Sequence, residues 1–221
     1  MIELTQELRR DFPELRALVW RIQGVRVARH SSELEDFKKN VIARVKNRYT
    51  LAGLKDEKTF RRYRDFFWRL NIDPTKIRPA SEALIRRVLQ GKSLPKINTL
   101  VDAYNLASME SGIALAAFDG DMVEGDLLMR YAAEGESFLG IGMKDKKILR
   151  GGEIVIEDGA KIIAVYPYRD ADNTKITLKT RNVLLVSCGV PGIREDDLYA
   201  AGKLGADYIT RFCGGFSALE K

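Results

Sequence analysis

The stretch Ile77–Asp119, IRPASEALIRRVLQGKSLPKINTLVDAYNLASMESGIALAAFD, is the most informative part of the sequence. It predicts two helices joined by a short connection. The first helix begins at Pro79, whose fixed φ suits a first helical position, and ends before Gly91, where a left-handed residue belongs. The second helix begins near Asn98 and ends at Gly112. We therefore expect this stretch to form a pair of helices that packs against the part of the chain after it.

The second helix carries a line of short polar side chains. Asn98, Asp102 and Asn105 are spaced i, i+4, i+7 and share one face of the helix. Asn and Asp are poor residues for a helix interior, and only Asn98 has a local reason to be there, as an N-cap. For Asp102 and Asn105 we expect a pocket or a buried hydrogen-bond network, with a solvated face as the alternative.

The pattern Val101-Asp102-x-x-Asn105, followed by Glu110-x-Gly112-x-x-Leu115-x-Ala117-Phe118-Asp119, resembles the B3/B4 editing domain of the phenylalanyl-tRNA synthetase β subunit. The likeness continues through Val186 and covers about half of the chain. It implies that this segment helps to wall a pocket where wrongly attached amino acids are removed from tRNA. Bacterial synthetases have Pro-Leu-His where this chain has Ala114-Leu115-Ala116, so the pocket histidine of the family is absent. In this respect the pattern is similar to free-standing proteins built around the same domain.

Length and composition set limits on the protein. A chain of 221 residues can build one good core, or one domain with a helical extension, and has no room for a class II catalytic core as well. No apolar run approaches the roughly 20 residues of a membrane-spanning helix, and the charged N-terminus MIELTQELRRDF does not fit a signal peptide. Cys188 and Cys213 show no metal or redox spacing. We expect a cytoplasmic protein with no membrane partner that is not a complete synthetase.

Positive charge is concentrated in the N-terminal third. The net charge is +6, but residues 1–80 hold 19 Lys and Arg against 11 Asp and Glu, whereas the remainder holds 18 against 20. This asymmetry indicates a surface for a polyanion such as tRNA, or else a solvated helical face. In the helix expected over 56–70, arginines alternate with aromatic residues at helical spacing, which favours core positions for the rings and phosphate contacts for the arginines. The candidate RNA contacts are Arg61, Arg62, Arg64, Arg86 and Arg87.

The remaining pattern predicts an α+β fold, and the resemblance implies that a helical N-terminal part packs on a β-sandwich-like core of the B3/B4 type. Amphipathic helices are expected at 32–48 and 195–211, and residues 1–24 read as a short strand or a helix pair. Beyond Asp119 short apolar runs predict strands at 127–131, 137–141, 153–157, 161–166 and 182–188. We divide the chain into a basic helical region (1–75), a B3/B4-like domain (76–190) and a C-terminal helix packed on that domain (191–221).

A second polar cluster, the loop Tyr168–Lys175, lies between two predicted strands. Charged residues crowded into one loop on a β scaffold often form a binding site, although a plain surface turn is the alternative. The resemblance implies that this loop closes the pocket opposite the first motif, with Thr174 and Thr177 as its two threonines. We therefore expect the loop and the Asn98–Asp102–Asn105 stripe to face one shared cavity.

His30 is the single histidine of the chain, which leaves no His-based catalytic triad or zinc site. No metal and no cofactor are expected, so any chemistry must use carboxylates, hydroxyls, lysine, backbone groups or the substrate itself. The resemblance implies a free-standing trans-editing factor, an aminoacyl-tRNA deacylase that binds the aminoacylated 3′ end of tRNA and hydrolyses its ester. A non-catalytic module that binds tRNA or an amino acid is the main alternative, and a hydrolase unrelated to tRNA is another.

Candidate site residues follow from the two polar clusters. For catalysis they are Asp102, Asn105, Thr174 and Lys175. For binding the amino-acid moiety they are Asn98, Ser108, Glu110, Arg169, Asp170 and Asp172. The sequence does not indicate a protein partner, the identity of the amino acid or that of the tRNA.

Overall fold

The structure is a computed structural model that describes residues 2–220. Within this range the helices are α1 (Gln6–Asp11), α2 (Ser32–Arg48), α3 (Lys58–Arg69), α4 (Ala80–Leu89), α5 (Thr99–Ser111) and α6 (Glu195–Cys213). The strands are β1 (Glu3–Leu4), β2 (Ala17–Gln23), β3 (Ala114–Asp119), β4 (Leu128–Tyr131), β5 (Glu134–Phe138), β6 (Lys147–Arg150), β7 (Ile154–Glu157), β8 (Ile162–Val165), β9 (Arg169–Asp170), β10 (Asn182–Cys188) and β11 (Phe216–Leu219). The 3₁₀ segments are η1 (Gly53–Lys55), η2 (Gly120–Met122) and η3 (Asp172–Thr174).

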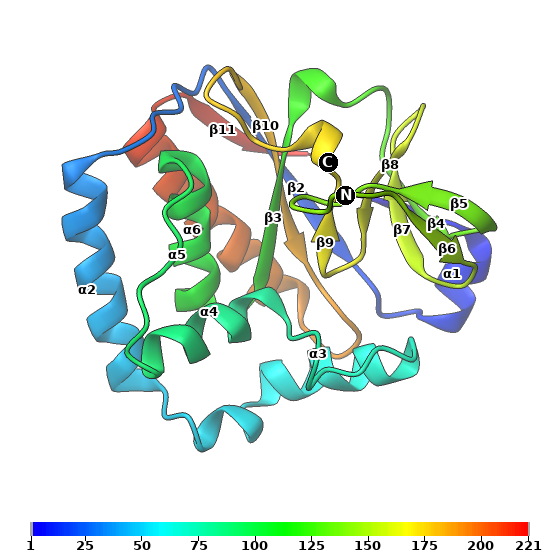
Figure 1. Ribbon diagram of the computed structural model, residues 1–221, viewed down its shortest axis with the longest axis horizontal. Helices are drawn as coiled ribbons and strands as arrows, with labels where there is room; N and C mark the ends of the chain where they lie inside the picture. The colour runs from blue at the N-terminus through cyan, green and yellow to red at the C-terminus, as the bar shows by residue number, and fades with distance from the viewer. Residues whose placement is uncertain (1, 221) are drawn as a thin grey trace.

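The strands form two main sheets that lie next to each other (Figure 1). One sheet has the order β11-β2-β10-β3, with every neighbour antiparallel. The other has the order β1-β4-β7-β8-β9, in which β1 and β4 are parallel, and β5 pairs with β6 in a separate hairpin. Helices α2, α5 and α6 lie on the side of the first sheet that faces away from the second sheet (Figure 1). The fold is α+β, as the sequence predicts.

Strand β10 holds the first sheet together. It pairs along its whole length with β2, from Asn182 opposite Gln23 to Cys188 opposite Ala17, and on its other edge with β3. All its residues except Asn182 are buried. A strand covered on both faces needs a continuous apolar run rather than an alternating one, which is why NVLLVSC is recognisable in the sequence. The predicted strand at 182–188 is confirmed to the residue.

The predicted helices are also present. Helix α5 begins after Asn98, whose side-chain oxygen accepts hydrogen bonds from the backbone N–H groups of Leu100 and Val101 at 3.1 and 2.9 Å. It ends at Gly112, which has a φ of 76°, a conformation that glycine adopts without strain. Three of the aromatic rings of α3, those of Phe60, Tyr63 and Phe67, are at most 1% exposed. Their assignment to the core is confirmed.

Several strands differ from expectation. Strand β3 was not predicted because its sequence, ALAAFD, contains three alanines and no polar–apolar alternation. Pairing with β10 outweighs that low propensity. Residues 1–24, for which the sequence predicts a short strand or a helix pair, contain β1, α1 and β2, and β5 lies at 134–138 instead of 137–141.

One hydrophobic core cluster draws on residues from Ile2 to Cys213, and so on all three segments into which the sequence was divided. A second cluster lies among the helices α2 to α5. It includes Val41, Phe60, Ile85 and Leu106, each at most 1% exposed. Over residues 2–220, no helix has the length and apolar content needed to cross a bilayer.

Glu82 is a fully buried carboxylate at the start of α4. Arg64 of α3 donates two hydrogen bonds to it, at 3.0 and 2.5 Å, and Arg86 approaches it to 3.5 Å. Removing the cation from a buried carboxylate costs several kcal/mol of folding stability. This bidentate pair therefore fixes α3 against α4.

We therefore expect Arg64→Ala to lower the free energy of unfolding by about 3 kcal/mol, since it leaves Glu82 buried with only the more distant Arg86. The control is Arg61→Ala, an exposed arginine on the same helix, which should change stability by no more than about 0.5 kcal/mol. Urea denaturation of the two variants measures the difference. Equal free energies of unfolding for the two variants would show that burial of Glu82 does not require Arg64.

Candidate active site

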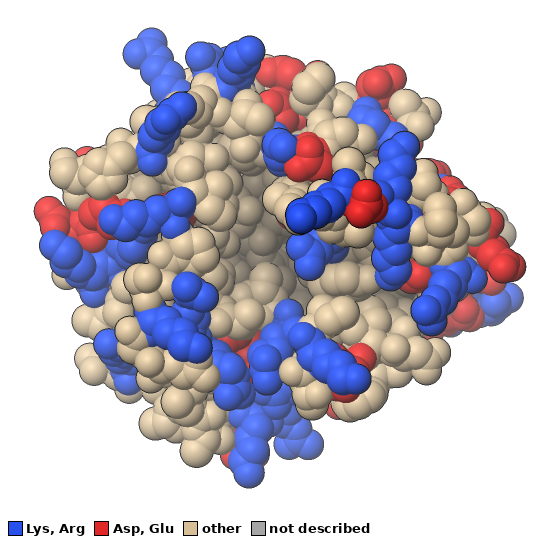
Figure 2. Space-filling model, viewed as in Figure 1, with Lys and Arg blue, Asp and Glu red and all other residues tan. Residues whose placement is uncertain are grey.

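A cavity lies between the two sheets. It has a volume of about 60 Å³, enough for several water molecules or a small side chain. Strand β3 contributes Ala114, Leu115, Ala116 and Phe118, and the chain from Ala164 to Tyr168 forms the opposite wall. Because β3 is rich in alanine, the space in front of it is not filled by its own side chains. Figure 2 shows a hollow in the middle of the molecule, with uncharged residues inside it and Lys and Arg side chains, with a few Asp and Glu, around its rim.

Tyrosine hydroxyls fix the cavity walls. The hydroxyl of Tyr63 accepts a hydrogen bond from the backbone N–H of Ala114 at 3.1 Å and donates one to the carbonyl of Cys188 at 2.5 Å. Tyr166 follows β8 and donates to the carbonyl of Gly189. The ends of β3 and β10 are thus held by α3 on one side and by the second sheet on the other. Burial raises the pKa of the phenols of Tyr63 and Tyr166, which keeps both protonated.

Among residues 2–220, Asp170 is the one acidic residue that lines this cavity. Its carboxyl group has no hydrogen bond or ion pair within the described part of the chain. Burial raises its pKa to about 7, although the neighbouring charge of Arg169 acts in the opposite direction. A carboxyl group in apolar surroundings that changes charge near neutral pH is a good partner for an ammonium group or a transferable proton.

Two further polar groups lie near Asp170. The pKa of the Tyr104 phenol is raised first by burial and then by the charge of Asp170, and the same holds for the thiol of Cys188. Tyr104 comes from α5, the helix of the first motif, and it is not itself among the residues that line the cavity. Cys188 lines the cavity, although its spacing alone reads as an ordinary buried thiol.

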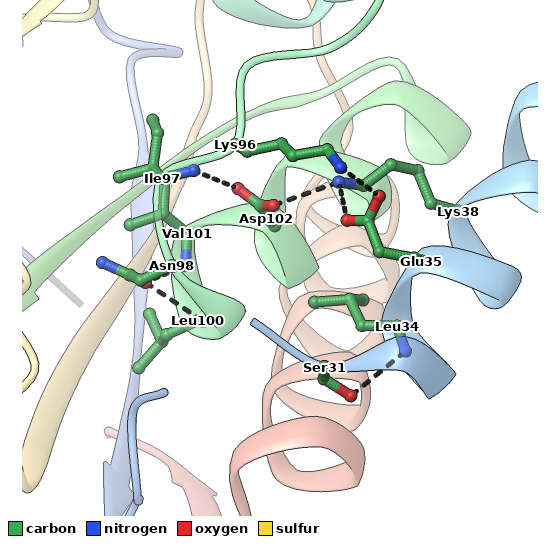
Figure 3. A network of polar contacts seen from close by, with 10 residues as sticks. All are labelled: Ser31, Leu34, Glu35, Lys38, Lys96, Ile97, Asn98, Leu100, Val101 and Asp102. Carbon is green, nitrogen blue, oxygen red and sulfur yellow. Dashed lines mark hydrogen bonds and ion pairs between the residues drawn. The ribbon is translucent and has the colours of Figure 1, made fainter. Parts of the chain in front are cut away.

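Asp102 is placed in a buried ion pair rather than in the central cavity (Figure 3). Its carboxylate lies 3.1 Å from the ammonium group of Lys38 and accepts a hydrogen bond from the backbone N–H of Ile97, also at 3.1 Å. Lys38 in turn pairs with Glu35 at 2.7 Å. Burial opposes the charge of Lys38, but the two carboxylates raise its pKa overall. The network explains why an aspartate stands inside α5, since it ties α2 to α5 and to the loop before it.

The expectation of one shared cavity is wrong for most of these residues. Asn98 is used as a cap, and Asn105 lines a cleft of about 10 Å³ together with Lys38 and Asp102. In the loop, Asp172 pairs with Lys175 at 2.7 Å and lines a different cavity, of about 370 Å³. None of the described cavities contains members of both clusters, because α5 turns its polar stripe toward α2 and α4. From the loop only Tyr168 and Asp170 reach the central cavity.

The other predicted loop residues have varied surroundings. Thr174 is fully buried, and its hydroxyl has no hydrogen-bond partner in the described chain. Arg169 is exposed and donates to the carbonyl of Ile141 at 3.2 Å. Both residues are therefore close to Asp170 in the sequence, but neither lines the central cavity.

Two predicted substrate contacts on α5 have internal partners. Ser108 donates to the carbonyl of Ile113 at 2.7 Å and is buried. Glu110 accepts two hydrogen bonds from Arg44, at 2.7 and 2.9 Å, and one from Tyr208 at 2.6 Å. These bonds hold α2, α5 and α6 together. Sequence could not find them, because Arg44 and Tyr208 are distant in the chain.

The arginines predicted to contact RNA fall into two groups. Arg64 and Arg86 point to the buried Glu82. Arg61 and Arg87 are exposed, and Arg62 is partly buried next to Gly192. Over residues 2–220, no three His, Cys, Asp or Glu side chains come together in a way that could hold a metal ion.

Comparison with known proteins identifies the family of this chain. The family model for the B3/4 domain matches residues 62–213. The phenylalanine–tRNA ligase β subunit of Dehalococcoides mccartyi is 30% identical over 210 residues, which are 92% of this chain and 24% of the relative. The β subunit of Geobacter sulfurreducens is 34% identical over 117 residues, 52% of this chain and 14% of the relative. This chain therefore spans less than a quarter of the length of either relative.

A solved structure shows the same fold. An N-terminal fragment of the phenylalanyl-tRNA synthetase β subunit from Pyrococcus horikoshii superimposes with a TM-score of 0.55 over 98% of this chain and 50% of that chain, at 11% sequence identity. The likeness covers both sheets and the helices, so the fold extends well beyond the region recognised by sequence motifs.

The raised pKa of Asp170 predicts a stability that depends on pH. The folded chain binds this proton more tightly than the unfolded chain, where the pKa is about 3.9, so stability is lost as the pH rises from about 4 to about 7. Asp170→Asn removes that loss. We expect its melting temperature to exceed that of the wild type by about 3 °C or more above pH 7, and the difference to vanish near pH 4.

Asp158→Asn is the matched control of opposite sign. Burial would raise the pKa of Asp158, but hydrogen bonds from Lys161 and from backbone N–H groups outweigh it and lower the pKa. This variant should be less stable than the wild type at neutral pH, with a difference that shrinks under acid conditions. A melting difference for Asp170→Asn that stays constant between pH 4 and pH 8 would contradict the raised pKa.

Proposed function

This chain belongs to the B3/4 domain family, and from that premise we propose that it binds tRNA and hydrolyses the ester of a tRNA that carries a wrong amino acid. The supporting observation is the central cavity, where the carboxyl group of Asp170 stands without a partner among apolar side chains. Such a space suits an aminoacyl group, whose side chain is enclosed while its ammonium group meets a carboxylate. Acting on tRNA charged elsewhere, it would work in the cytoplasm.

Asp170 is the proposed partner of the ammonium group. An ionised carboxylate in apolar surroundings is unfavourable when it is unpaired, and an ammonium group at hydrogen-bond distance removes that penalty. Above about pH 7 the same argument disfavours an uncharged acyl group, because it would leave the ionised carboxylate unpaired. Ala116, which is partly buried, leaves the space beside it open. The cavity is therefore proposed to select esters that carry a free α-amino group and a small side chain.

The reaction itself is simple. The oxygen of a water molecule forms a bond to the ester carbonyl carbon, the bond from that carbon to the ribose oxygen breaks, and the proton of the water passes to the ribose oxygen. An aminoacyl ester is already activated, so orientation of the ester and of the water accounts for a large part of the rate. Tyr104 is a protonated phenol near Asp170 and is proposed to donate a hydrogen bond to the carbonyl oxygen as negative charge develops there.

The catalytic roles predicted for Asp102, Asn105, Thr174 and Lys175 remain predictions. Of these, Thr174 has a buried hydroxyl that is free to bond, whereas Asp102 already serves Lys38. We propose that Asp102 acts on the site only by holding α5, and with it Tyr104, in place.

The decisive measurement is the release of amino acid from a panel of tRNAs that carry non-matching amino acids. We expect Asp170→Asn to lower the rate on the best substrate by on the order of 10²-fold, equivalent to about 2.7 kcal/mol of transition-state stabilisation. Asp145→Asn, an exposed aspartate in the turn between β5 and β6, is the isosteric control and should leave the rate unchanged. His30→Ala should also leave it unchanged. A wild-type protein that binds these tRNAs but releases no amino acid would be a non-catalytic binding module.

The pH profile tests the role of Asp170 separately. Because the pKa of the free carboxyl group is about 7, kcat/KM should fall as the pH drops below about 7, where Asp170 becomes protonated. The profile of kcat should fall at a lower pH, since the bound ammonium group lowers the pKa of its carboxylate partner. After subtraction of spontaneous ester hydrolysis, Asp170→Asn should lack this acid limb in both profiles. An acid limb that persists in Asp170→Asn would assign it to another group.

A further inference from the structure

An open groove of about 640 Å³ lies beside the central cavity. Its walls are the end of α3 with the segment Leu70–Ile77, and the β6–β7 turn around Gly151. Tyr168 lines both the groove and the cavity, and Tyr131 of β4 also lines the groove. A ligand in this groove would therefore contact the same residue as a ligand in the cavity.

Four cations line the groove: Arg69, Lys76, Lys147 and Arg150. All four are exposed. Over residues 2–220, the side chains of Lys147 and Arg150 make no hydrogen bond or ion pair, and Lys76 is 3.9 Å from Asp73. Arg69 lies over the ring of Phe12, at 4.2 Å, and donates to a backbone carbonyl.

The two acids of the groove are already satisfied by neutral groups. Asp73 accepts hydrogen bonds from the backbone N–H and the hydroxyl of Thr75, at 2.9 and 2.7 Å. Glu153 accepts from the backbone N–H of Arg150, at 3.2 and 3.1 Å. The two carboxylates thus make hydrogen bonds within the protein, whereas the side chains of Lys147 and Arg150 are free. The groove is therefore suited to an extended anion.

The groove also offers aromatic surface. Tyr131 and Tyr168 are partly buried, so each keeps an accessible part. The ring of Tyr168 is held by the edge of Phe67, at 6.2 Å between centroids, and the hydroxyl of Tyr131 by Asp11, at 3.0 Å. Fixed aromatic rings among free cations are the combination that binds single-stranded nucleic acid, because bases stack on the rings while phosphates meet the cations. An acidic peptide would use the cations and leave the rings unused.

We propose that this groove binds the unpaired 3′-terminal nucleotides of an RNA, with Lys147 and Arg150 on its phosphates and Tyr168 under the nucleotide nearest to the cavity. The proposal rests on the proposed function for its choice of RNA, since the ester to be hydrolysed lies at that end. It assigns the RNA path to the β5–β6 hairpin and to the chain at the end of α3, and not to the arginines that the sequence predicted as RNA contacts.

The probe is a fluorescein-labelled single-stranded RNA of eight nucleotides that ends in CCA and carries no amino acid. Fluorescence anisotropy gives its affinity at several salt concentrations for the wild type and for Lys147→Ala/Arg150→Ala. Loss of two phosphate contacts should weaken binding at least 10-fold at low salt and reduce the log–log salt slope by about 1.4, since each single-strand contact contributes about 0.7. The control is Lys39→Ala/Lys46→Ala, two exposed lysines of α2 with the same change in charge, which should bind like the wild type.

The outcomes separate this proposal from the proposed function. If the groove variant and the control bind the RNA equally, or if the wild type does not bind it, the groove proposal is overturned whether or not the protein deacylates tRNA. If only the groove variant loses the RNA while no misacylated tRNA is hydrolysed, the groove stands and the hydrolytic function falls. A poly-glutamate peptide that displaces the RNA at equal charge concentration would overturn the proposal in favour of a site for acidic polymers.

Discussion

The structure depends on the pairing of β10 with two partners at once. Its backbone bonds to β2 on one edge and to β3 on the other, so segments near residues 20, 116 and 185 become neighbours. Since β10 is buried, each of its amide and carbonyl groups needs such a partner. This pairing makes a single sheet from distant parts of the chain, and the sheet then provides one wall of the central cavity.

The cavity is a consequence of small side chains facing a second sheet. Alanines of β3 leave room that larger residues would fill, and the chain from Ala164 to Asp170 closes that room from the other side. Tyr63 binds both β3 and the end of β10 with one hydroxyl group, so the wall cannot relax into the space. The walls leave Asp170 partly buried, and this burial raises the pKa of its carboxyl group.

Among the helices, buried ion pairs hold neighbouring helices together. Asp102 and Lys38 join α5 to α2, and Glu82 joins α4 to α3 through Arg64. Such pairs add little net stability compared with apolar contacts, but each is costly to break, so they restrict how the helices can be arranged. Tyr104, whose phenol is influenced by the charge of Asp170, lies on the helix that the Lys38–Asp102 pair holds. Asp102, which the sequence suggests as a catalytic residue, therefore fixes the position of a helix.

The sequence by itself determined the elements with strong local signals. Asn98 and Gly112 marked the ends of α5, the apolar run of β10 was recognised to the residue, and the motif around Val101–Asp119 indicated the B3/4 family. Only the tertiary structure decided the partners. Whether Asp102 meets a substrate or Lys38, and whether Asp170 faces solvent or the apolar lining of the central cavity, depends on residues far away in the chain. Local periodicity records which face of an element is polar, whereas the charge state and function of a group depend on what the fold places against that face.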